Sequence, residues 1–111
     1  MKNLMIIDGY KASIAFDPEI DMFRGEFIGL NGGADFYATD VEGLRQEGKI
    51  SLETFLQECR ARGVEPRKDF SGKFVLRVPP AVHEAAAAAA AAHGESLNQW
   101  IASVIKKASH A

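Results

Sequence analysis

The chain has 111 residues, of which 47% are hydrophobic and 25% charged, a composition that excludes disordered and fibrous proteins. No stretch has the roughly eighteen continuous large apolar residues of a membrane span, and residues 1–7 are too short for a secretory signal, so we expect a cytoplasmic protein without membrane contact. The net charge of −2 is unevenly divided. Residues 1–58 carry five Lys/Arg and eleven Asp/Glu, whereas residues 59–111 carry eight and four. An acidic first half suits a basic partner, and a basic second half suits phosphate.

The first part of the chain predicts a small antiparallel meander. Residues 10–16 and 22–30 are apolar-rich stretches joined by turn-forming residues, which predicts a β-hairpin. Gly25 and Gly29 in the second stretch indicate a bulge or a place where another chain approaches closely. A strong turn signal at residues 31–33 then precedes a third antiparallel strand over residues 35–39.

A long amphipathic helix is predicted to follow the meander. Asp40 is suited to cap the helix, and apolar residues recur at spacings of three and four over residues 41–61. Gly43 and Gly48 each cost about 1 kcal/mol against alanine in a helix interior. A helix that kinks or restarts at its middle is therefore an open alternative. Gly63 is suited to end the helix.

The second part of the chain predicts a separate domain after a linker. Residues 64–72 contain a proline, a charge cluster and a glycine, which predicts a linker between domains at residues 1–63 and 73–111. Large apolar residues then alternate with other residues over residues 73–78, which predicts a half-buried strand ended by Pro79 and Pro80.

Two helices are predicted after this strand. Pro80 is well placed in the first turn of a helix that runs through an alanine tract to His93, with Gly94 as its stop. Ser96 is suited to cap the second helix, which carries one apolar stripe that includes Trp100. We interpret Trp100 as a core residue rather than as a platform for stacking nucleic-acid bases.

A strand followed by two helices in so few residues leaves its strand edge unpaired and its apolar face uncovered, so it needs a second copy. Two such strands paired antiparallel form a ribbon that fits the major groove of DNA. The side chains predicted to contact bases are those of Lys73, Val75 and Arg77. The residues predicted to bind DNA phosphate, at the positive start of the last helix, are Ser96, Leu97 and Asn98.

These patterns resemble two known families. The stretch KFVLRVP, the following helix and the turn HGESLNQW resemble the ribbon-helix-helix family of Arc and MetJ type, in order and without gaps. The wider chain resembles the HicB family of antitoxins. That resemblance is carried by GYKASIAFDPEIDMFRGEFIGL, ECRARGVEP, SGKFVLRVPPAVHE and GESLNQWI, of which the last two are the most specific. One departure is the nearly pure alanine helix at residues 85–92, which predicts a thin core.

The HicB resemblance implies an α+β protein: a small β-meander plus helix, similar to a degenerate RNase H fold, followed by a ribbon-helix-helix domain that dimerises. It implies that residues 1–63 neutralise a HicA-like toxin, a small basic protein that cleaves mRNA. It also implies that residues 73–111 bind double-stranded operator DNA as a homodimer or a higher even-numbered oligomer and repress the chain's own operon.

Enzyme and metal chemistry find little support in the sequence, and we expect no cofactor. The three histidines are scattered with no Cys or carboxylate at zinc spacing, and Cys59 has apolar neighbours that indicate a buried, unreactive thiol. Turn and cap roles explain most of the aspartates that a residual nuclease would need: Asp8, Asp17, Asp21, Asp35 and Asp40. The other alternative to an antitoxin is a stand-alone repressor whose first domain senses a ligand or oligomerises.

Overall fold

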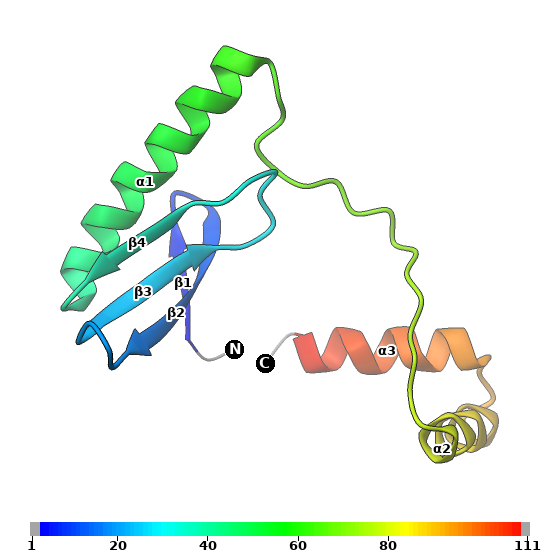
Figure 1. Ribbon diagram of the computed structural model, residues 1–111. Helices are drawn as coiled ribbons and strands as arrows, with labels where there is room; N and C mark the ends of the chain where they lie inside the picture. Colours follow the sequence, from blue (N-terminus) through cyan, green and yellow to red (C-terminus); the bar gives the residue numbers. More distant parts are fainter. Residues whose placement is uncertain (1–2, 110–111) are drawn as a thin grey trace. The chain divides into compact units, whose positions relative to one another are not determined.

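The computed structural model describes residues 3–109, which divide into two compact units between Phe70 and Ser71. The first unit is an antiparallel sheet with one helix, and the second contains two helices (Figure 1). The α+β class predicted from the sequence is confirmed. Among the described residues, no helix has the length and apolar character that crossing a membrane requires.

The sheet of the first unit is a four-stranded meander. Its strands, in the spatial order of the sequence, are β1 (Leu4–Ile7), β2 (Tyr10–Asp17), β3 (Met22–Phe27) and β4 (Asp35–Ala38). The predicted hairpin and third strand are confirmed as β2, β3 and β4. Strand β1 was not predicted. It pairs with β2 through a two-residue turn in which Asp8 and Gly9 both have positive φ, 49° and 82°, as the tightest hairpins require.

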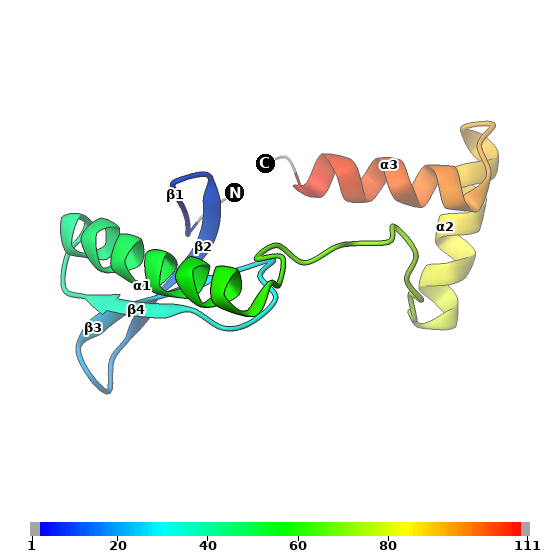
Figure 2. The same cartoon turned by 90° about the horizontal axis from the view of Figure 1, so that it is seen from above.

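Helix α1 (Val41–Arg62) is continuous and covers one face of the sheet, as Figures 1 and 2 show. The predicted start and end are confirmed. The Asp40 side chain accepts a hydrogen bond of 2.6 Å from the amide of Gly43. At the other end, Gly63 adopts a left-handed φ of 66° and its amide donates to the carbonyl of Arg60.

Two glycines let α1 approach the sheet closely. A Cβ atom on Gly48 would collide with Ile7 and press on the ring of Phe36, so this position of the helix lies directly against the sheet. A Cβ on Gly25 of β3 would overlap the Phe36 ring on the neighbouring strand. Gly25 therefore accommodates an aromatic ring of its own sheet, and the helix continues through Gly48 because close packing offsets its low helix propensity. The core around Phe36 includes Phe27, Leu44 and Leu52.

Several residues after α1 remain hydrogen bonded to the first unit. Residues 65–68, which we assigned to a linker, hydrogen bond with the loop after β3. The Asn31 side chain donates to the carbonyls of Glu65 (2.9 Å) and Arg67 (3.1 Å), and the Lys68 amide donates to the carbonyl of Gly29 (2.8 Å). The Arg67 guanidinium lies 3.8 Å from the centre of the Tyr10 ring.

The second unit contains α2 (Pro80–Ala92) and α3 (Leu97–Ser109). Both predicted helices are confirmed, with Pro80 in the first turn of α2 and Gly94 in a left-handed conformation (φ 67°) between the helices. Residues 73–79 precede α2 without regular secondary structure. The half-buried strand predicted over residues 73–78 is therefore not formed in the single chain, where this segment has no partner strand among the described residues and is exposed.

Candidate nucleic-acid interface

The segment predicted to contact DNA bases begins at a short turn. The Lys73 amide donates to the Ser71 hydroxyl (3.1 Å), and Gly72 between them has a left-handed φ of 82°. From Lys73 to Val78 every side chain is exposed in the single chain. Phe74, which we predicted to face inward, is 73% exposed, and Val75, which we predicted to face outward, is 85% exposed. In a single chain this segment therefore has no buried face.

An apolar groove of about 780 Å³ lies between this segment and the two helices. Leu76 and Val78 border it on the segment, and Val82 borders it on α2. Helix α3 contributes five large side chains to its lining: Leu97, Trp100, Ile101, Val104 and Ile105. Arg77, which we predicted to point outward, also borders the groove in the single chain.

The helices of the second unit bury little of their apolar surface against each other. Ala90 is the buried residue of α2, and none of the described residues of α3 is fully buried. Trp100 and Ile101 are half-buried. This is the thin core that the alanine tract predicted, because methyl groups cannot fill the space that larger side chains would occupy.

The start of α3 is capped by a reciprocal pair of hydrogen bonds. The Ser96 hydroxyl accepts from the Gln99 amide and the Gln99 side chain accepts from the Ser96 amide, each at 3.1 Å. The first two helical amides, those of Leu97 and Asn98, have no acceptor within the helix. The predicted phosphate-binding residues thus lie together at one helix start, with Ser96 occupied as the cap.

Sequence reasoning missed the part of the groove that α2 contributes. Val82 and His83 border the groove from the first turn of α2. The signal was present, since Val82 is a large apolar residue followed by almost nothing but alanine. Among residues 3–109 no three His, Cys, Asp or Glu side chains lie close enough to hold a metal ion.

The five aspartates that a residual nuclease would need have structural roles. Asp40 caps α1, and Asp17 accepts a hydrogen bond from the amide of Glu19 in the turn after β2. Asp8 and Asp21 have the positive φ of turn residues. Asp35 accepts a hydrogen bond of 2.6 Å from Arg24, and this carboxylate raises the pKa of the Arg24 guanidinium.

One comparison with known proteins gives a match, which covers parts of both units. Residues 55–105 match the model of the HicB family, a stretch that runs from the end of α1 into α3. We found no match among curated proteins or among solved structures. HicB-family proteins are generally the antitoxins of toxin–antitoxin systems. The match spans 51 of the 111 residues, and it shows that this part of the chain is similar to HicB-family proteins.

Proposed function

We propose that this protein neutralises a HicA-like, mRNA-cleaving toxin through residues 1–63 and represses its own operon through a ribbon-helix-helix dimer of residues 73–111. It acts by binding and is not an enzyme. Two copies of the chain, or a higher even number, form the regulator, and its ligands are the toxin and double-stranded operator DNA.

The apolar groove of the second unit is the observation that carries this proposal. In a single chain Leu76 is 55% exposed and Val82 is 50% exposed, although both border a groove lined by large side chains of α3. Burying one such side chain fully is worth roughly 1.5–3 kcal/mol. A second copy that supplies its own segment and helices would cover the groove and give the unpaired strand a partner.

The paired segments would form a two-stranded ribbon. Residues alternate across a strand, so packing Phe74, Leu76 and Val78 inward turns Lys73, Val75 and Arg77 outward in both copies. A ribbon of this kind fits the DNA major groove, where Lys and Arg donate to guanine and Val contacts a thymine methyl group. In this arrangement Arg77 leaves the border of the groove that it occupies in the single chain.

The start of α3 would fix the ribbon on the DNA backbone. The amides of Leu97 and Asn98 point out of the helix start, where the helix dipole favours an anion. Ser96 holds that turn in place through its capping pair with Gln99. These phosphate contacts do not depend on the DNA sequence. They set the position of the side chains that contact bases.

The charges of the two parts of the chain support two different ligands. Residues 59–111 carry eight Lys/Arg and four Asp/Glu, which favours binding to phosphate. Residues 1–58 carry five Lys/Arg and eleven Asp/Glu, which favours a basic protein such as the proposed toxin.

A cellular assay tests both functions. The proposed function requires a small basic protein encoded beside this chain. This protein is expressed in a host that also carries a reporter under the chain's own promoter. We expect growth arrest by that protein alone, recovery when the full chain is co-expressed, and reduced reporter transcription whenever the chain is present. Arrest that continues in the presence of the chain would overturn the antitoxin function. A reporter that does not respond would overturn the repressor function.

A further inference from the structure

Strand β4 has an unpaired edge in the first unit. It is the last strand of the sheet and pairs only with β3 among the described residues. The Phe27 amide donates to the carbonyl of Ala34, so alternation along an antiparallel pair turns the backbone groups of Asp35 and Tyr37 to the free side. The Ser51 hydroxyl of α1 reaches the Asp35 carbonyl from that side, at 3.0 Å. The amides of Asp35 and Tyr37 and the Tyr37 carbonyl remain for another strand.

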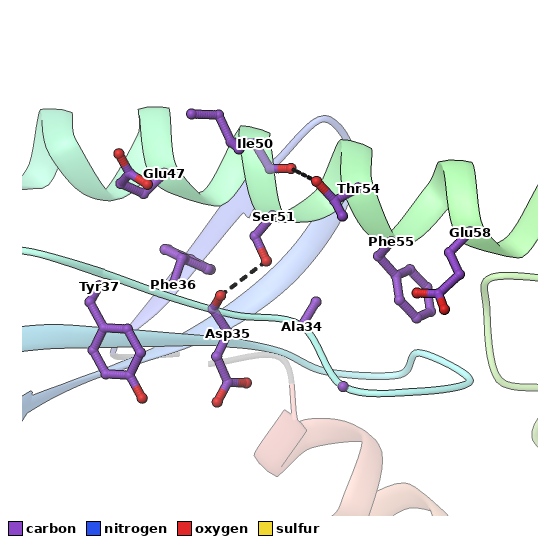
Figure 3. Close-up of a pocket in the computed structure, with 11 residues that line it drawn as sticks. Ala34, Asp35, Phe36, Tyr37, Glu47, Ile50, Ser51, Thr54, Phe55 and Glu58 are labelled. Atoms are coloured by element: carbon purple, nitrogen blue, oxygen red, sulfur yellow. Dashed lines mark hydrogen bonds between the residues drawn. The ribbon is translucent and has the colours of Figure 1, made fainter.

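A groove runs along this edge between β4 and α1. It has a volume of about 530 Å³, and its lining includes Tyr37 on the strand and Ile50 and Thr54 on the helix. Figure 3 shows the Ser51 hydroxyl above the Asp35 carbonyl, with the Asp35 carboxylate and the Tyr37 ring on the other side of β4 from the helix. Ile50 is 58% exposed and Tyr37 is 41% exposed. The edge therefore has apolar side chains beside it on both elements.

The charged residues that line this groove are acidic. They are Asp35, Glu47 and Glu58. Asp35 is bound to Arg24 and Glu58 lies 2.7 Å from Arg62, whereas Glu47 makes no ion pair among the described residues. Arg45 and Lys49 are also on α1, but the 100° turn per residue puts them on the opposite flank of the helix from Glu47. Glu47 is therefore the one charged residue of the lining without an ion pair among the described residues, and its charge is negative.

We propose that the β4 edge and its groove bind an extended, basic segment of the toxin by strand addition. The toxin backbone pairs with Asp35 and Tyr37, an apolar side chain lies against Ile50, and a Lys or Arg meets Glu47. This inference rests on the proposed function, because it takes the first unit to be the toxin-binding unit. The acidic lining favours a basic protein over a second copy of this chain, which would bring a second Glu47 and Asp35 to the same edge.

Proline substitutions at the two free edges of the sheet test the backbone pairing. Tyr37→Pro removes the outward amide of β4. Ile6→Pro is the matched control, because the Ile14 amide donates to the Asn3 carbonyl and alternation therefore turns the Ile6 amide outward on β1, the opposite edge. Isothermal titration calorimetry measures binding of the full-length variants to the purified basic protein encoded beside this chain. We expect Tyr37→Pro to weaken binding about tenfold or more, and Ile6→Pro to leave it within about twofold of wild type.

Charge reversal on the two flanks of α1 tests the acidic lining in the same titration. Glu47→Lys should weaken binding about fivefold or more at low salt, whereas Glu53→Lys, an exposed position outside the groove, should change it by less than about twofold. Circular dichroism verifies the fold of each variant. In the wild-type complex, the amide of Tyr37 should also gain protection from hydrogen exchange.

The outcomes separate the two proposals. If the wild-type chain does not bind the basic protein, the antitoxin function fails and this inference falls with it. If wild type binds but Tyr37→Pro and Glu47→Lys bind equally well, or if the Tyr37 amide exchanges as fast in the complex as in the free protein, the docking site lies elsewhere on the first unit and only this inference is overturned.

Discussion

The packing of the first unit leaves different amounts of space around its individual glycines. Gly25 lies directly under the ring of Phe36, which is a buried core residue, and a Cβ there would overlap three ring atoms. Gly33, in the loop before β4, has no atom within 4 Å of the equivalent position. Two glycines in the same unit thus differ in the space available to a methyl group.

Gly25→Ala should therefore destabilise the first unit by about 1–3 kcal/mol, because an overpacked core must shift an aromatic ring. Gly33→Ala should be neutral or slightly stabilising, because it restricts the unfolded chain without a clash. Urea unfolding of both full-length variants, followed by circular dichroism, measures the difference. Equal stability of the two variants would show that the ring of Phe36 does not lie over Gly25.

The Arg77 side chain is the residue at which we test the predicted contact with DNA bases. Arg77→Ala should lower the affinity for the chain's own promoter DNA by about 1–3 kcal/mol and reduce the salt dependence of binding. Arg45→Ala, a change to an exposed residue of α1, is the control and should leave binding unchanged. Fluorescence anisotropy over a range of salt concentrations provides both values. Binding by Arg77→Ala that equals wild type at every salt concentration would rule out Arg77 as a base-contacting residue.

At the scale of elements, the sequence predicted β2 to β4 and all three helices, because their periodicity and end signals are local. Strand β1 was missed although its turn, Asp8-Gly9, is a strong hairpin signal. The strand itself has only four residues, and its sequence shows no alternation of apolar and polar residues, because Leu4 and Ile6 are as apolar as Met5 and Ile7, which face the core. The continuity of α1 could not be predicted, because packing of Gly48 on the sheet is a tertiary effect.

The path of the chain after α1 was also beyond sequence reasoning. Proline and charged residues indicated a linker, but residues 65–68 hydrogen bond with Asn31 and Gly29, more than thirty positions earlier. The same limit applies to the groove between β4 and α1, since only the sheet order shows which strand has a free edge. By contrast, the large apolar residues that line the groove of the second unit can be recognised in the sequence alone.

Asn31→Ala should release this segment from the first unit. It removes the donor to two carbonyls at an exposed site, so we expect a loss of about 1 kcal/mol in stability. Hydrogen exchange at the Lys68 amide, which bonds to Gly29, should become faster. Asn31→Asp keeps the shape and the turn preference but loses the donor, and it should behave like alanine. If Asn31→Asp instead matched wild type, the turn preference rather than the two hydrogen bonds would be what holds the segment.

At the scale of the whole molecule, the two units differ in how complete they are. The first unit has a core of its own around Phe36 and Leu52. The second unit leaves its largest side chains along an open groove, and residues 73–79 have no strand partner in one chain. We therefore expect folding, dimerisation and DNA binding of the second unit to be one linked event.

The stoichiometry of the complex with DNA tests this claim most directly. Sedimentation equilibrium of the full chain with a labelled fragment of its own promoter yields the mass of the bound protein. We expect an even number of 12.1 kDa chains on each fragment, with two as the smallest complex. A complex that contains a single chain, or a promoter fragment that binds no chain at all, would contradict it.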